Sequence, residues 1–289
     1  MVWDTFIYYA VISVVLYAAG SLMPLILDRG TSVGNSSCGE ACGGASDGNA
    51  GDNGGVADGK GRTLAMSLCS WAIAVFAAFI IVLWCSLDRP PLRTMGETRL
   101  WYSLFAMVAG LFTYFRWKYK WILPFSTVLS TVFIIINCVK PQIHDSTLMP
   151  ALQSGWFIPH VTVYMFSYSI LGCAFILAVW GLVRNRSDLH SGIETLVYIG
   201  LAFLTFGMLS GSLWAKEAWG HYWNWDPKET WAAVTWLAYL LYIHFRALGK
   251  GSSKLLYVLI IIAFACLQMC WWGVEYLPSA QDSIHIYNR

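Results

Sequence analysis

Long apolar segments separated by short polar loops are the feature that most constrains the fold of this chain. Eight segments approach the roughly twenty apolar residues that cross a bilayer as a helix. They cover residues 5–27, 64–87, 98–115, 121–139, 160–183, 193–213, 230–248 and 254–274. Only 12% of the 289 residues are charged, about half the share found in soluble domains. The sequence therefore predicts an all-α, polytopic transmembrane helix bundle of about eight spans.

The amino-terminal part differs in composition from the rest. Residues 29–62 are mostly Gly, Ser, Asp and Asn, which is typical of a flexible linker without a core of its own. We therefore divide the chain into residues 1–63, a span followed by a flexible loop, and residues 64–289, a single membrane domain. Cys38 and Cys42 lie in the loop and are interpreted as incidental. The first apolar run has no basic region before it, so we expect it to stay as a span.

One polar, aromatic segment lies between two of the apolar ones. It runs from Trp214 to Trp231 (WAKEAWGHYWNWDPKETW), and we call it the Trp-rich segment. It holds five of the sixteen Trp residues together with five charged side chains, so it cannot lie in hydrocarbon. Trp favours the membrane surface because its ring is apolar and carries one N–H donor. An interfacial belt needs only scattered rings, so this concentration predicts a surface for a large, flat ligand.

The second half of the Trp-rich segment also predicts a helix start. Asp226 takes the N-cap position and Pro227 the first helical position, and Glu229 follows the cap by three residues as in a capping box. We therefore interpret the two carboxylates as caps in preference to catalytic acids. Asp226 is still the only candidate for an acid or base in the segment.

The run WGHYWNWDPKETW resembles the Trp-rich signature, known as WWD, of the CcsA (ResC) family of cytochrome c biogenesis proteins. The related CcmC and CcmF families share Trp-Gly-x-x-Trp-x-Trp-Asp but diverge after the Asp. The resemblance covers about residues 156–285 and extends more loosely from residue 90. It implies a protein that receives heme b across the membrane and binds it externally. As a holocytochrome c synthase in a complex with CcsB (ResB), it would attach heme through thioethers to Cys-x-x-Cys-His of apocytochrome c.

The resemblance also implies which residues handle heme. The expected contacts are Trp214, Trp219, His221, Trp223, Trp225 and Asp226. His160 at a span mouth and His285 beyond the last span match the family's two ligands of the external heme iron. His244 lies about 25 Å deeper than Pro227 along the same helix and matches the ligand of a second, transmembrane heme. The other ligand of that heme would come from CcsB.

Basic residues in short loops predict the orientation in the membrane. Lys and Arg follow the third, fifth and seventh spans, which places those loops in the cytoplasm and the Trp-rich segment and both termini outside. Arg89, Arg93 and Arg99 depart from this pattern because the same count places them outside. Beside an aromatic surface they are candidates for binding heme propionates, with solvated interfacial arginines as the alternative. We list Arg89 and Arg93 among the heme contacts.

The eight Cys form no Cys-x-x-Cys pair, so the covalent acceptor of heme must be another chain. The expected partners are a CcsB-type membrane protein, apocytochrome c and a thiol-reducing thioredoxin-like protein, and no basic tract suggests nucleic acid. Two other functions stay open: a CcmC-like heme exporter or delivery protein without attachment chemistry, and a non-catalytic membrane scaffold. The expected location is the bacterial inner membrane, with the thylakoid membrane as the alternative.

Overall fold

The computed structural model describes residues 2–34, 53–92, 94–139, 154–249 and 251–278, and these ranges contain helices and no strand. The elements are α1 (Val2–Gly34), α2 (Asn53–Leu87), α3 (Met95–Trp117), α4 (Ile122–Val139), α5 (Phe157–Val183), α6 (His190–Trp219), α7 (Pro227–Ala247), α8 (Ser253–Trp271) and a short 3-10 helix, η3 (Gly273–Tyr276). The predicted all-α helix bundle is confirmed.

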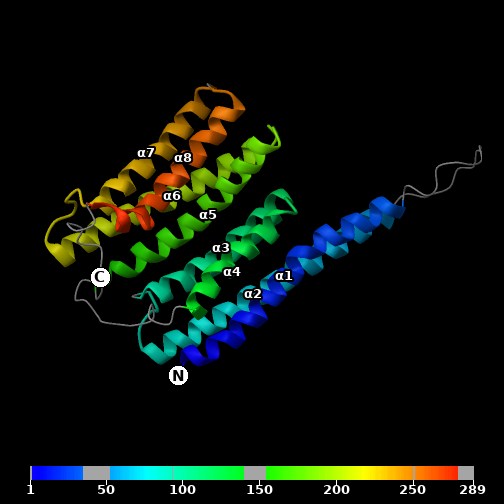
Figure 1. Cartoon of the computed structure of the whole chain (residues 1–289), viewed down its shortest axis with the longest axis horizontal. Coiled ribbons are helices and arrows are strands. Elements are labelled where there is room, and N and C mark those ends of the chain that lie inside the picture. Colours follow the sequence, from blue (N-terminus) through cyan, green and yellow to red (C-terminus); the bar gives the residue numbers. More distant parts are fainter. Residues whose placement is uncertain (1, 35–52, 93, 140–153, 250, 279–289) are drawn as a thin grey trace, which may run out of the picture.

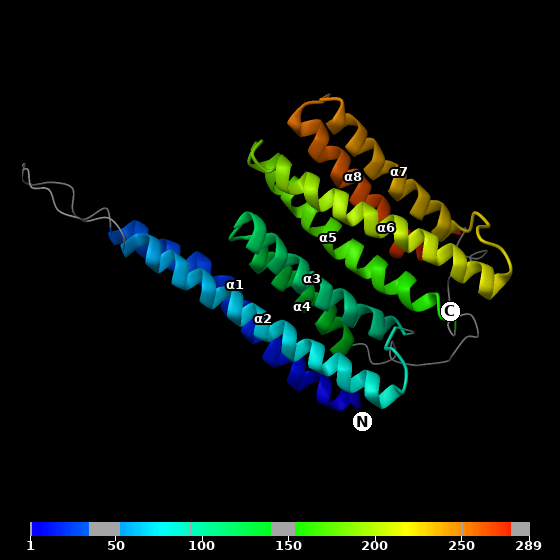
Figure 2. The ribbon, with the colours of Figure 1, turned by 180° about the vertical axis from the view of Figure 1, so that it is seen from behind.

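The helices form four antiparallel hairpins that lie side by side in chain order, as Figures 1 and 2 show from opposite sides. Consecutive helices pair as α1 with α2, α3 with α4, α5 with α6, and α7 with α8. Helix α5 also packs against α3 and α8, and it is the most buried of the apolar helices. Residues on α5 therefore lie at the centre of the second half of the bundle.

Six helices, α1, α2, α4, α5, α6 and α8, are long and apolar enough to cross a membrane, so the chain is an integral membrane protein. Helices α3 and α7, which we predicted as spans, are not among them. They have 23 and 21 residues, enough to cross about 30 Å at 1.5 Å per residue. Charged side chains such as Glu97 and Arg246 make them more polar, and both helices pack among the other six.

The limits of α1 and α2 correct one prediction. We expected a loop over residues 29–62, but α1 continues to Gly34 and α2 already begins at Asn53. A helix is held by its backbone hydrogen bonds, which do not stop where the apolar run stops. These two helices also pack along each other as a hairpin. The two incidental cysteines, Cys38 and Cys42, lie outside the described residues.

Buried polar side chains connect helices both between and within the hairpins. The hydroxyl of Tyr17 on α1 donates to the carbonyl of Met107 on α3 at 2.7 Å and lies 3.1 Å from the hydroxyl of Ser126 on α4. Ser167 on α5 donates to the carbonyl of Gly200 on α6 at 2.7 Å. Hydrocarbon offers no water to polar groups, so these internal partners are what make such residues compatible with a membrane bundle.

Candidate functional site

The two ends of the bundle differ in chemistry. The starts of α3, α5 and α7 and the ends of α6 and α8 meet at one end, which we call the Trp-rich end (Figure 1). The loops after α3, α5 and α7, which carry Lys and Arg, lie at the opposite end, as their sequence positions predict. The side of the membrane on which each end lies stays a prediction.

The connection between α6 and α7 is fixed at both ends. Gly220 ends α6 in the left-handed region (φ 86°), and its N–H donates to the carbonyl of Lys216. Asp226 caps α7, and the Glu229 carboxylate accepts from the N–H groups of Asn224 (2.8 Å) and Asp226 (3.2 Å). The predicted capping box is confirmed. Both carboxylates are nearly buried in this structural role.

The connection exposes aromatic rings. Trp225 is 70% exposed and has a left-handed backbone (φ 57°), which is unusual for a bulky residue. Trp223 meets it edge-on with ring centroids 5.9 Å apart. Tyr222 is also exposed, and the ammonium of Lys216 lies 5.3 Å from its ring. The exposed rings of Trp225 and Tyr222, with the half-buried Trp223, form an aromatic surface.

Trp214 behaves differently from the exposed rings. It is only 3% exposed and packs against Phe157 of α5 and Trp219 of α6, with ring centroids 5.2 Å and 4.8 Å away. The ring of His160 stacks on it at 5.4 Å. We predicted Trp214 as a ligand contact, but its burial makes it the packing support of His160. Trp219, which contacts Trp214, is half-buried.

His160 occupies the first turn of α5 and is held in one orientation. Its Nδ1 lies 2.8 Å from the carbonyl oxygen of Gly207 on α6. A carbonyl only accepts, so Nδ1 carries the proton and Nε2 carries the lone pair in the neutral ring. This arrangement, a backbone carbonyl fixing the tautomer through one nitrogen, is the usual support of a metal-binding histidine.

A glycine notch on α6 makes room for the His160 ring, and our sequence analysis missed it. A Cβ on Gly211 would lie 2.6 Å from ring atoms of His160, and one on Gly207 would lie 3.1 Å from Tyr164. His160 and Tyr164 are four residues apart on α5, and Gly207 and Gly211 are four residues apart on α6. The His160 ring therefore packs where Gly211 has no side chain, and the Tyr164 ring packs where Gly207 has none. The spacing Gly-x-x-x-Gly in an apolar helix is the signal that could have revealed the contact.

Arg89 has a different partner from the one we expected. Its guanidinium donates to both carboxylate oxygens of Glu97, at 3.0 Å and 2.9 Å, and the two side chains are 14% and 3% exposed. Glu97 also completes a capping box with Thr94 at the start of α3. Arg89 is therefore committed to an internal ion pair, and this contact gives no support to a role in binding propionates. Arg93 lies outside the described residues.

Among the remaining predicted histidines, the structure places His244 far from His160. His285 lies outside the described residues. His221 lies in the α6–α7 connection, and its Nδ1 is buried without a hydrogen-bond partner in the described part of the chain. His244 is near the opposite end of α7 and is exposed on the flank of the bundle. The neighbouring Arg246 forms an ion pair with Glu194 of α6 at 3.0 Å, which leaves His244 facing outward.

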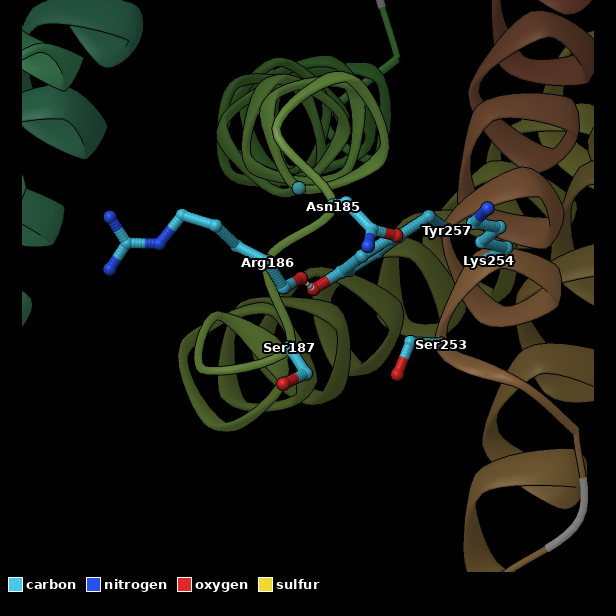
Figure 3. Close-up of a pocket in the computed structure, with 7 residues that line it drawn as sticks. Asn185, Arg186, Ser187, Ser253, Lys254 and Tyr257 are labelled. Carbon is cyan, nitrogen blue, oxygen red and sulfur yellow. Dashed lines mark hydrogen bonds between the residues drawn. The ribbon is translucent and has the colours of Figure 1, made fainter.

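A small polar cavity of about 220 Å³ lies at the opposite end of the bundle, between the α5–α6 loop and the start of α8 (Figure 3). The Tyr257 hydroxyl donates to the Arg186 carbonyl at 2.5 Å and closes one side. The Arg186 guanidinium extends away from the cavity, as Figure 3 shows. It donates two hydrogen bonds to Asp188 and holds the pKa of that carboxyl below its ordinary value. This cavity shares no residue with the Trp-rich end.

The chain is thus an integral membrane helix bundle that carries a fixed histidine and exposed aromatic rings at one end. The chain belongs to the cytochrome c assembly protein family, whose model matches residues 92–280. That membership gives it a role in cytochrome c biogenesis and confirms the resemblance to the CcsA family.

Several cytochrome c biogenesis proteins named CcsA are similar to this chain. The protein of Chlamydomonas reinhardtii is 33% identical in an alignment over 175 residues, with 56% of this chain and 50% of that protein covered. The chain thus spans half the length of this relative. The protein of Panax ginseng is 31% identical over 260 residues (71% of this chain, 81% of that protein). The protein of Marchantia polymorpha is 28% identical over 275 residues (74% and 85%).

Proposed function

We propose that the Trp-rich end holds heme b and presents it to apocytochrome c, to which this chain and a CcsB-type partner attach it as a holocytochrome c synthase. The observation that carries the proposal is the fixed His160 ring. Its Nδ1 lies 2.8 Å from the Gly207 carbonyl oxygen, and the ring stacks on Trp214 at the Trp-rich end. Nε2 of His160 is then the iron ligand, and His285 is the expected second axial ligand.

The exposed rings have a separate task. The exposed Trp225, with the half-buried Trp223 and Trp219 of the same segment, offers apolar faces against which a porphyrin can pack. Trp214 would act indirectly, because its ring stacks against the ring of His160. Asp226 would hold the connection in place through its cap and would not contact the reacting atoms.

Attachment needs positioning more than acid or base chemistry. The two thiols of an apocytochrome Cys-x-x-Cys-His add across the heme vinyl groups and form thioethers, and the peptide His replaces one axial ligand of the iron. The contribution of this chain would be to hold the heme so that the vinyl carbons face the thiols. A thioredoxin-like protein would keep those thiols reduced.

Delivery of heme would begin at the opposite end. Basic loops at that end favour a cytoplasmic location, which places the Trp-rich end outside the cytoplasm. His244 is exposed on α7, where a histidine of CcsB can reach the other face of a transmembrane heme. The membrane would be an energy-transducing one, either the bacterial inner membrane or the thylakoid membrane.

The test is the absorption spectrum of the detergent-purified chain, with and without the CcsB partner, after expression in heme-replete cells. The wild type should show a reduced low-spin heme spectrum, and His160→Ala/His285→Ala should lose or shift it. His190→Phe is the control, because His190 stacks on Tyr257 at the opposite end and a phenyl ring keeps that contact. A colourless wild-type complex would overturn the proposal. Thioether formation on a supplied apocytochrome then separates attachment from export.

A further inference from the structure

Arg99 is a charged side chain with two nitrogen atoms that have no hydrogen-bond acceptor in the described part of the chain. It lies on α3 only four residues after Met95, at the Trp-rich end. Its Nε and Nη1 atoms are buried and have no hydrogen-bond partner in the described part of the chain. Arg89 at the same end differs, because Glu97 receives its guanidinium through two hydrogen bonds.

The residues around Arg99 attract its charge but do not accept hydrogen bonds from its Nε and Nη1 atoms. The guanidinium lies 5.7 Å from the ring centroid of Trp272, a cation–π contact. Glu275 is a charged neighbour, yet within the described ranges it forms no ion pair with Arg99. An aromatic face attracts the charge but accepts no N–H bond. Burying the Nε and Nη1 atoms of a guanidinium without acceptors is unfavourable, and an anion at this place would supply them.

A continuous series of aromatic rings joins Arg99 to His160. Along α5, His160 contacts Tyr164 and Tyr164 contacts Tyr168, at 4.7 Å and 5.6 Å between ring centroids. On α8, Trp271 meets Tyr168 at 5.7 Å and Trp272 at 6.1 Å, and Trp272 lies under Arg99.

His160 and Arg99 also lie at similar distances from the starts of their helices. His160 and Arg99 lie three and four residues into α5 and α3, within about 6 Å of the helix starts, and these helices pack side by side. Both residues therefore lie near the helix starts at the Trp-rich end, where the heme is proposed to bind.

We propose that Arg99 binds a carboxylate of the heme, so that the Trp-rich end recognises the propionate edge of the porphyrin as well as its iron. This inference rests on the proposed function, since it concerns the same ligand. Arg99 forms charge-assisted hydrogen bonds to the carboxylate and fixes the rotation of the porphyrin in its own plane. That rotation decides where the two vinyl groups lie.

The experiment compares iron protoporphyrin IX with its dimethyl ester, which has the same rings and iron but no carboxylate. Both are titrated by Soret absorbance into the full-length chain in nanodiscs, alone and with the CcsB partner. The wild type should bind heme on the order of 10- to 100-fold more tightly than the diester. Arg99→Gln should lose this preference while its affinity for the diester stays the same, and Arg99→Lys should keep part of it.

Arg116→Gln is the matched control. Arg116 lies at the other end of α3 with its guanidinium 5.4 Å from the Trp117 ring, so it shares the helix and the type of contact but not the location. This variant should keep the wild-type preference.

The outcomes separate the two proposals. Equal affinity of the wild type for both porphyrins, with binding that still requires His160, would overturn the inference and leave the proposed function standing. A preference that Arg99→Gln does not change would also overturn it, because the anion at Arg99 would then be another one, such as a lipid phosphate. If neither porphyrin binds to the chain or to the complex, the proposed function fails and this inference fails with it.

Discussion

The ring of His160 lies directly against Gly211, and a Cβ on Gly211 would come within 2.6 Å of Nδ1 and Cε1 of that ring. Gly211→Ala should therefore push the imidazole away from the Gly207 carbonyl. We expect heme affinity to fall at least about tenfold, since a displaced ring loses the bond that fixes its tautomer. Soret titration of the purified variant measures the change.

Gly172→Ala is the control for that substitution. Gly172 lies on the same helix as His160, and a Cβ there would meet only ordinary contacts at 3.8 Å with Phe264 and Tyr102. Its heme affinity should equal that of the wild type, with thermal stability unchanged or slightly raised. If the two alanine variants bind heme equally well, the ring of His160 does not depend on the notch.

Trp214 and Trp225 should respond differently to truncation. Trp214 is 3% exposed and supports His160, so Trp214→Ala should destabilise the protein by about 3–5 kcal/mol and also weaken heme binding. Trp225 is 70% exposed, so Trp225→Ala should leave the melting temperature unchanged and weaken heme binding alone. Thermal unfolding and Soret titration are measured on both variants. A Trp225→Ala protein with a melting temperature below that of the wild type would mean that this ring stabilises the fold.

The protein should tolerate loss of the Asp226 charge but not loss of the side-chain oxygen that caps α7. In the wild type the Lys228 N–H donates to Asp226 at 2.9 Å. Asp226→Asn keeps an oxygen that can accept this bond and should leave the stability nearly unchanged. Asp226→Ala should cost about 1 kcal/mol of stability. The measurements are thermal unfolding and the rate of heme attachment to an apocytochrome. A stable Asp226→Asn protein without attachment activity would instead assign the carboxylate to the chemistry.

Arg89 should contribute to stability and not to heme binding. Arg89→Gln leaves the nearly buried Glu97 carboxylate without its partner and should cost about 3–5 kcal/mol. Arg89→Gln/Glu97→Gln should recover most of the loss, because neither charge then stays buried. Thermal unfolding of the single and double variants tests this. Reduced heme affinity in a fully stable Arg89→Gln protein would restore the propionate role that the sequence suggested.

His244 should matter only in the complex. It is exposed on α7, so His244→Ala should unfold at the wild-type temperature. The spectrum of the isolated chain should not change, whereas the complex with CcsB should lose the contribution of its transmembrane heme. A spectral change in the isolated chain would show that His244 meets its ligand without a partner.

The helices and the cap could be predicted because their signals are local. Apolar runs of span length mark each helix, and Asp226, Pro227 and Glu229 lie within four positions of the sequence. The ends of α1 and α2 could not be predicted from hydropathy, since helical hydrogen bonding continues past Asp28 into Gly-rich sequence.

The roles of individual residues at the Trp-rich end depended on contacts that the sequence does not contain. Trp214 and Trp225 belong to one motif, yet one faces α5 and the other faces outward. The choice of Glu97 as the partner of Arg89 is likewise settled by the turn into α3. Which face of a helix meets a neighbour is a tertiary property, and the spacing of aromatic residues alone does not reveal it.

The connection between α6 and α7 is anchored before any ligand arrives. Its N–H groups at Asn224 and Asp226 bind Glu229, the Trp225 carbonyl accepts from Thr230, and Gly220 closes the preceding helix. The backbone that carries the exposed Trp rings is therefore preorganised, and little conformational entropy is lost when a ligand docks. If the Trp-rich end handles a transient cargo as proposed, neither its arrival nor its release requires this connection to refold.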